Sequence, residues 1–133
     1  MSKMNHGRGY VYSLQYHLVW CVKYRKKILY AEIEQSFKEI LVDLCSKHDI
    51  VIEVLKTDKD HVHMLIALKP QHYIPTAVKT LKGQSARRLF KQHPEIKQFL
   101  RGGHLWNPGY FIATVSENTE DQVRKYIQEQ KQQ

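Results

Sequence analysis

The fold can be worked out from the stretch Asp58–Lys69, DKDHVHMLIALK, in which a turn, two histidines and a long apolar run follow one another. Successive side chains of a β-strand point to opposite faces, so His61 and His63 share one face while Val62 takes the other. The Cα atoms of the two histidines are then about 6.5–7 Å apart, which lets their imidazoles converge on one ion. We therefore predict a strand over residues 61–68 whose apolar face packs against helices and whose histidine face stays open.

The segments on either side of this strand have the periodicities of further strands and of amphipathic helices. Alternation with period two, or a short β-branched or aromatic run, predicts a strand, and apolar side chains every three or four residues predict a helix. The predicted strands cover residues 11–22, 50–56, 61–68 and 110–115. The predicted helices cover residues 31–48, 74–91 and 119–130. The second and third strands are expected to form a hairpin through a DKD turn.

This order of elements, β-α-β-β-α-β-α, is typical of a split βαβ, or ferredoxin-like, α+β fold. It predicts an antiparallel, RRM-like sheet with the first two helices on one face and an extra C-terminal helix. The chain has 133 residues, which suits one compact domain. We expect a single domain over residues 1–133, with a core at about 10–116 and the C-terminal helix at about 119–131.

The charge balance favours a polyanionic partner. Lysines and arginines number 21 against 13 aspartates and glutamates, which gives a net charge of +8. Nucleic acid is the first candidate partner and an anionic membrane surface the second. No apolar run reaches the ~18–20 residues of a membrane span, and the N-terminal residues lack the apolar core of a signal peptide. We expect a cytoplasmic protein.

Two clusters of basic side chains are candidates for contacts to DNA phosphates, one after the first strand and one along the second helix. The candidates are Lys23, Arg25, Lys26, Lys27, Lys79, Lys82, Arg87, Arg88 and Lys91. Each of them taken singly also fits a solvated surface charge, so the prediction of DNA contact rests on their clustering. Tyr24 and Tyr73 are candidate stacking platforms for unpaired bases, although an aromatic side chain near a turn often serves packing.

The two histidines alone do not establish a metal site, because half-exposed polar residues on an open face are the more common explanation of such a pair. A metal ion also needs a third ligand. The segment KYIQEQ, residues 125–130, places Tyr126 and Gln130 one helical turn apart on one face. That face can either dock a short tail helix or present a phenol and an amide oxygen to a bound ion.

Four landmarks of the sequence together resemble the single-tyrosine transposases of the insertion-sequence 200/605 family, which are HUH endonucleases. They are DHVHMLI, LKGQSARRL, LWNPGYFIATV and KYIQEQ, in that order, and the resemblance runs from residue 10 to residue 130. It implies that Tyr126 is the catalytic nucleophile and that His61, His63 and Gln130 are the metal ligands. The sequence does not depart from the family pattern at these four positions.

The resemblance also implies an activity, a cofactor and partners. The expected protein is a transposase that cleaves and rejoins single-stranded DNA at element ends through a 5′-phosphotyrosine, and that recognises DNA hairpins there. Imidazole ligands suit Zn, Ni or Mn better than Mg, whereas the family implies Mg²⁺ or Mn²⁺, and we expect the latter pair. The implied assembly is a homodimer with active sites shared in trans, so that His61 and His63 of one chain meet Tyr126 of the other.

Two other classes of function fit parts of the pattern. A non-catalytic, RRM-like nucleic-acid-binding protein has the same sheet, but it reads RNA through aromatic side chains where this chain has His61 and His63. A small metal-dependent hydrolase has the histidines and uses Tyr126 only structurally. A further histidine, His17, lies on the polar face of the first strand and would lie beside the pair if that strand neighbours residues 61–68.

Overall fold

The structure is a computed structural model, and it describes residues 6–7, 10–11, 14–115 and 119–130. Four antiparallel strands form its main sheet, in the order β4-β5-β3-β6. The strands are β3 (Leu14–Cys21), β4 (Val51–Asp58), β5 (His61–Leu68) and β6 (Phe111–Thr114). This is the strand order of the ferredoxin-like fold, so the predicted α+β class is confirmed. A separate two-stranded ribbon joins β1 (His6–Gly7) and β2 (Tyr10–Val11).

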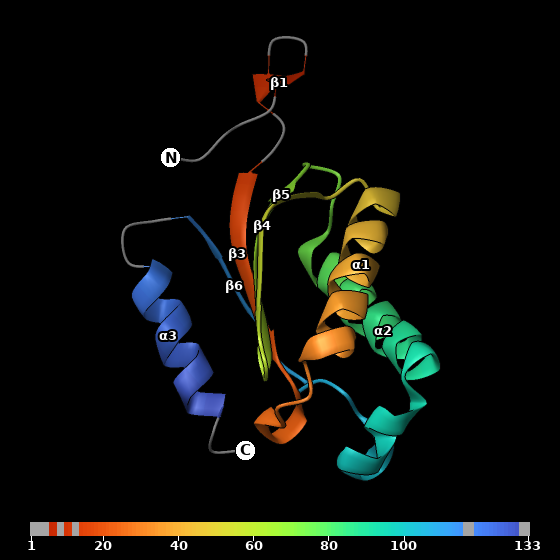
Figure 1. Cartoon of the computed structure of the whole chain (residues 1–133). Coiled ribbons are helices and arrows are strands. Elements are labelled where there is room, and N and C mark those ends of the chain that lie inside the picture. The colour runs from red at the N-terminus through yellow and green to blue at the C-terminus, as the bar shows by residue number, and fades with distance from the viewer. Residues whose placement is uncertain (1–5, 8–9, 12–13, 116–118, 131–133) are drawn as a thin grey trace.

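The helices lie on both faces of the sheet. Helices α1 (Ala31–Lys47) and α2 (Ile74–Gln92) cover one face, and α3 (Thr119–Glu129) lies against the other, next to β6 and β3 (Figure 1). Three short 3-10 helices follow the strands and α2: η1 (Lys23–Arg25), η2 (Pro94–Phe99) and η3 (Arg101–Gly103). No helix among the described residues is both long and apolar enough to cross a membrane.

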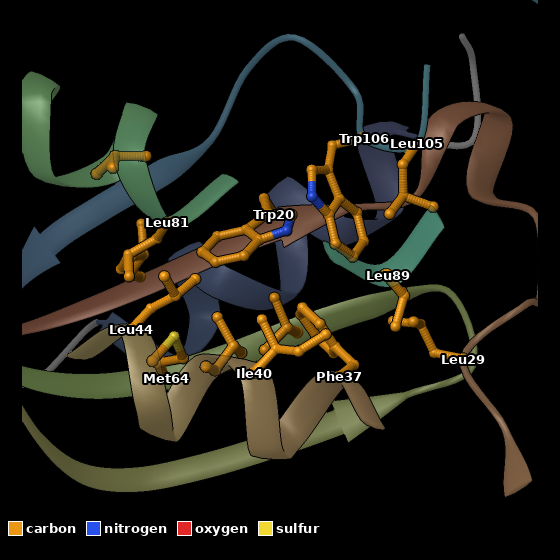
Figure 2. Close-up of a cluster of buried hydrophobic side chains, with 14 of the residues drawn as sticks. Trp20, Leu29, Phe37, Ile40, Leu44, Met64, Leu81, Leu89, Leu105 and Trp106 are labelled. Carbon is orange, nitrogen blue, oxygen red and sulfur yellow. The ribbon is translucent and has the colours of Figure 1, made fainter. Parts of the chain in front are cut away.

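The apolar core fills the space between the sheet and helices α1 and α2. Trp20, Phe37, Met64 and Leu81 are fully buried there, and the ring of Trp106 packs against those of Trp20 and Phe37 (Figure 2). Burying each such side chain contributes roughly 1.5–3 kcal/mol to folding. Because this core uses one face of the sheet, the residues that alternate with it lie on the α3 side.

Alternation along β5 therefore decides where the histidines point. Val62, Met64 and Ile66 belong to the core, so His61 and His63 lie on the face that α1 and α2 do not cover, as predicted. β5 is the second strand of the order and is paired on both sides, with β4 and with β3. The histidine face is consequently held by rigid sheet and not by a loop.

The predicted boundaries need small corrections. The first strand of the main sheet begins at residue 14 and not at residue 11, and residues 12 and 13 lie outside the described part of the chain. β4 continues to Asp58, which pairs with His61, so the turn contains only Lys59 and Asp60 and not all of DKD. The Lys59 amide donates to Asp58 Oδ1 at 2.7 Å, which stabilises this tight turn. The strand predicted at 110–115 covers only residues 111–114.

Candidate active site

Three histidines lie close together on the open face of the sheet. β3 pairs with β5 so that Val19 is opposite His63, which places His17 on the neighbouring diagonal position. His17 Nδ1 is 2.8 Å from His63 Nε2, and the two ring centroids are 5.0 Å apart. The expected position of His17 is thus confirmed. Burial lowers the pKa of His63, and the neighbouring His17 lowers it further, so the neutral imidazole is favoured.

A buried carboxylate orients the other predicted ligand. His61 Nδ1 donates to Asp60 Oδ1 at 2.8 Å, and the Asp60 side chain is only 9% exposed. The second oxygen, Oδ2, accepts from Arg25 Nε at 3.0 Å and from Nη2 at 2.7 Å. Burial alone would raise the pKa of the Asp60 carboxyl, but the bonds from His61 and Arg25 outweigh it and hold that pKa below its ordinary value. With Nδ1 bonded, His61 keeps Nε2 for a ligand.

Helix α3 carries Tyr126 to the same face. The Tyr126 ring lies 5.9 Å from the ring of Phe111, which pairs with Val19 in the strand next to β5. Arg25 Nη1 donates to the carbonyl oxygen of Ile127 at 3.1 Å, so the arginine that bonds Asp60 also holds this helix. Val123 is 5% exposed and supplies the apolar contact of α3.

The hydroxyl of Tyr126 is buried and has no hydrogen-bond partner among the described residues. Burial raises the pKa of this phenol well above its ordinary value, and the nearby Cys21 thiol adds to the effect. The phenol is therefore protonated at neutral pH, and a buried hydroxyl without a partner is costly in a native structure. Such a hydroxyl is explained if its partner is a substrate or an ion.

Asn107 connects Gln130 to the end of the sheet where His61 lies. Gln130 is buried, and its Oε1 accepts from Asn107 Nδ2 at 3.0 Å. The backbone N–H of Asn107 donates to the carbonyl oxygen of Cys21 at 2.9 Å, and Cys21 is the residue paired with His61. His61, His63, Tyr126 and Gln130 are thus brought to one end of one sheet face.

The donor set fits a divalent cation that takes nitrogen and oxygen ligands. No three His, Cys, Asp or Glu side chains of the described residues form a metal-holding group, and the predicted set differs from such a group in using the amide oxygen of Gln130. His61 Nε2 and His63 Nδ1 have no partner in the described part of the chain, and Gln130 Oε1 has a second lone pair beside its bond to Asn107. The buried, unpartnered oxygens Tyr126 Oη and Asn107 Oδ1 are further polar atoms that an ion or a phosphate would satisfy.

The basic candidates for DNA contact fall into two groups. Three have partners within the chain: Arg25 bonds Asp60, Arg88 bonds Asp43 at 2.7 Å, and Lys82 Nζ bonds the carbonyl oxygens of residues 107–109. Burial lowers the pKa of Lys82 to about 8, so its charged form still predominates at pH 7. The exposed candidates are Lys26, Lys27, Lys79, Arg87 and Lys91, and Lys23 is half-buried.

Sequence reasoning missed two residues of the site, and the structure gives a third residue contacts that were not predicted. Asp60 directly precedes His61 in DHVH, and this adjacency is the only local signal of its role. Asn107 was not among the predicted site residues, although its side chain donates to Gln130. Arg25 was predicted as a phosphate contact, and the contacts that the structure gives it are to Asp60 and to α3.

Comparison with known proteins gives the family. A family model described as "Transposase IS200 like" matches residues 10–130. The chain belongs to the IS200-like transposase family. This transposase is 50% identical over 128 residues to the ISDra2 transposase TnpA of Deinococcus radiodurans, covering 96% of the chain and 91% of that relative. It is 30% identical over 123 residues to the IS200 transposase of Salmonella typhimurium, covering 90% and 81%.

Solved structures support the same fold for the IS200-like transposase. The crystal structure of a Deinococcus radiodurans transposase superposes with a TM-score of 0.90 at 47% identity, covering 96% of the chain and 98% of that structure. A REP-associated tyrosine transposase bound to a REP hairpin superposes with a TM-score of 0.60 at 12% identity, covering 93% and 68%. At that identity the second likeness shows the fold alone.

Proposed function

We propose that this IS200-like transposase cleaves and rejoins single-stranded DNA with Tyr126 as the nucleophile. One observation carries the proposal. The Tyr126 hydroxyl is buried without a partner on the sheet face that carries His61 and His63. A hydroxyl held in this way costs the fold stability if nothing binds it, and a phosphate oxygen is the partner that we propose for it.

The chain's own residues define the reaction. The Tyr126 oxygen forms a bond to phosphorus and loses its proton, while the 3′ oxygen of the scissile bond leaves and takes up a proton. The products are a 5′-phosphotyrosine and a free 3′-hydroxyl, and attack by another 3′-hydroxyl reverses the step without ATP. His61, His63 and Gln130 would hold Mg²⁺ or Mn²⁺, which supplies charge neutralisation at the scissile phosphate when bound. Asp60 and Arg25 keep the His61 ring and α3 in place.

The proposed partners follow from the family. Hairpins at element ends are the proposed structured DNA, in line with the relative that is bound to a REP hairpin. A homodimer is part of the proposal, because moving an element requires work on two DNA ends and each chain supplies one Tyr126. A cytoplasmic location is also part of it, because the DNA substrate lies there.

A denaturing gel tests the reaction. The chain is incubated with Mn²⁺ and single-stranded DNA that carries candidate element ends, and a covalent protein–DNA adduct is expected. Tyr126→Phe should abolish the adduct and leave DNA binding within about twofold, because only one hydroxyl is lost. Tyr73→Phe removes a hydroxyl from an exposed ring and should leave the adduct intact. Binding without an adduct in the unaltered chain would favour a non-catalytic binding protein instead.

A further inference from the structure

A groove separate from the candidate active site opens between η1, the start of α1 and the 3-10 helix η2. Its volume is about 740 Å³, which lies within the range of pockets that hold small organic groups. Its floor is apolar, because Ile28, Ile96 and Leu100 line it and are buried. The roles proposed for the histidines, Tyr126 and Gln130 leave this groove unexplained.

Exposed aromatic rings form its walls. Tyr24, Tyr30 and Phe99 line the groove and are 46%, 52% and 54% exposed. Aromatic side chains are usually well buried, so three that converge on one hollow indicate a binding surface. Tyr24 also has a φ of 57°, and the following Arg25 a φ of 51°. Two successive left-handed residues other than glycine are strained, and such strain is concentrated at functional sites.

The charge at the groove limits the kind of ligand. Lys26 and Lys27 line it and are exposed, and neither forms an ion pair within the described residues. No aspartate or glutamate is among its described lining residues. The exposed Gln98 amide offers both a donor and an acceptor at the rim. A ligand with a flat aromatic ring and attached phosphates fits these features. Its ring can stack on the aromatic walls, its phosphates can bind the lysines, and polar atoms on the ring can bond the amide.

The groove is adjacent to the candidate active site through η1. Tyr24 lines the groove, and the next residue, Arg25, bonds Asp60 and the carbonyl oxygen of Ile127. Consecutive Cα atoms are about 3.8 Å apart, so one short turn contacts both places. The turn after β3 and the C-terminal end of α3 lie at the same end of the sheet (Figure 1). The groove therefore lies at the same end of the sheet as the candidate active site.

We propose that this groove holds an unpaired nucleobase of single-stranded DNA, stacked on Tyr30 and Phe99, with the adjoining phosphates on Lys26 and Lys27. The inference rests on the proposed function for the identity of the strand. It adds the place at which the protein holds bases that flank the cleaved bond.

The test compares DNA with and without bases. The Tyr126→Phe chain is used, because it forms no adduct and gives a clean equilibrium. Fluorescence anisotropy measures its affinity for an oligothymidine of about ten nucleotides and for an abasic oligomer of equal length. The oligothymidine should bind at least about tenfold tighter, and Tyr30→Ala or Phe99→Ala should each weaken it about tenfold while leaving the abasic oligomer unchanged.

Lysine and control variants separate the contributions. Lys26→Ala should reduce the salt slope of binding by about 0.7 for both oligomers, because it removes one phosphate contact. Val42→Ala removes an exposed apolar side chain from another part of α1, outside the groove lining, and should change neither affinity. Unchanged melting temperatures of the variants show that the fold is intact.

Several results would overturn the proposal. Equal affinity for the two oligomers means that no base is held, and an unaltered oligothymidine affinity in folded Phe99→Ala and Tyr30→Ala chains means that the groove is not used. A selective loss of duplex binding in these variants would assign the groove to a duplex. Adduct formation is measured in a separate assay with the unaltered chain, which keeps Tyr126. An adduct without base-dependent binding overturns the groove alone, and base-dependent binding without an adduct overturns the proposed function alone.

Discussion

Both carboxylate oxygens of Asp60 accept hydrogen bonds from side chains of the candidate active site. Oδ1 accepts from His61 and Oδ2 from Arg25, whose Nη1 also holds the Ile127 carbonyl of α3. A carboxylate that bonds one ring nitrogen of a ligating histidine fixes the ring orientation and leaves the other nitrogen for the metal. Asp60 is therefore a positioning residue for the proposed metal site.

Asp60→Asn should weaken Mn²⁺ binding to the chain by about 10–100-fold, because an amide orients His61 less strongly than a carboxylate does. Titration calorimetry without DNA measures this affinity directly. Asp58→Asn is the matched control, since it makes the same change on an exposed residue whose Oδ1 bonds only the neighbouring Lys59 amide. If both variants bind Mn²⁺ as tightly as the unaltered chain, Asp60 does not position the ligand.

The sequence predicts those site residues that have a local pattern. Alternation along residues 61–68 puts His61 and His63 on one face, and helical spacing relates Tyr126 to Gln130. The contacts of Asn107 with Gln130 and of Arg25 with Ile127 join residues 23 and 102 positions apart. No local periodicity reports on such contacts, so the second partner in each case emerges only from the fold.

Helix α3 carries the proposed nucleophile, and few contacts attach it to the sheet. It is a short helix with exposed polar faces, held by buried Val123, by the Arg25 bond to Ile127 and by Gln130 on Asn107. The apolar contact is small compared with the core under α1 and α2. We expect α3 to be less stably attached than those two helices.

Val123→Ala should release α3 without unfolding the domain, because it removes about 1–3 kcal/mol of apolar contact from this helix only. Amide hydrogen exchange should speed up across residues 119–129 and stay unchanged in α1 and α2. Arg124→Ala, which removes an exposed side chain paired with Asp121 on the same helix, should leave the exchange of α3 nearly unaltered. Faster exchange throughout the sheet would instead show that α3 unfolds together with the core.

Strands and long helices were predictable as elements, whereas the short 3-10 helices were not. The period-two and 3.6-residue patterns are strong in β5 and α1 because one face of each packs in the core. η1 and η2 are too short to show such a repeat, and the first residue of η1 is placed by a long-range contact, the bond from the Lys23 amide to the Leu105 carbonyl oxygen. The groove they line could therefore not be predicted from periodicity.

For the molecule as a whole, the candidate active site and the cationic helix α2 lie on opposite faces of the sheet. The histidines and Tyr126 lie on the α3 face. Helix α2, which carries the exposed cations, packs with α1 on the opposite face (Figure 1). A DNA ligand that touches both regions has to pass around the edge of the sheet. A structured hairpin on one side and a single strand on the other would satisfy this division.

Lys79→Ala together with Arg87→Ala should reduce the salt slope of hairpin binding by about 1.8, since each lost phosphate contact changes it by about 0.9 for duplex DNA. The slope is measured from affinities over a series of salt concentrations. Arg88→Ala is the control, because its guanidinium is paired with Asp43 at 2.7 Å and faces less solvent. A slope unchanged in the double variant would place the hairpin elsewhere.

The proposed assembly decides whether the histidines and Tyr126 of one active site come from one chain or from two. In the single chain α3 lies on its own sheet, and the connection at residues 116–118 is outside the described part of the structure. In a two-fold dimer the partner's α3 can occupy the same position, because exchange of a terminal element preserves every contact of that element. The proposed homodimer would then combine His61 and His63 of one chain with Tyr126 of the other.

Mixing inactive chains distinguishes the two arrangements. His63→Ala chains and Tyr126→Phe chains are each expected to form no adduct alone. With sites shared in trans, a heterodimer has one intact site and one doubly broken site, so about half of the normal activity per heterodimer should return. With sites formed in cis, both sites of the heterodimer are broken and nothing returns.

A mixture of His61→Ala with His63→Ala chains is the control, because it has no intact histidine pair in either arrangement and must stay silent. Exchange of subunits is verified with two affinity tags, and a silent first mixture with verified exchange refutes the shared site.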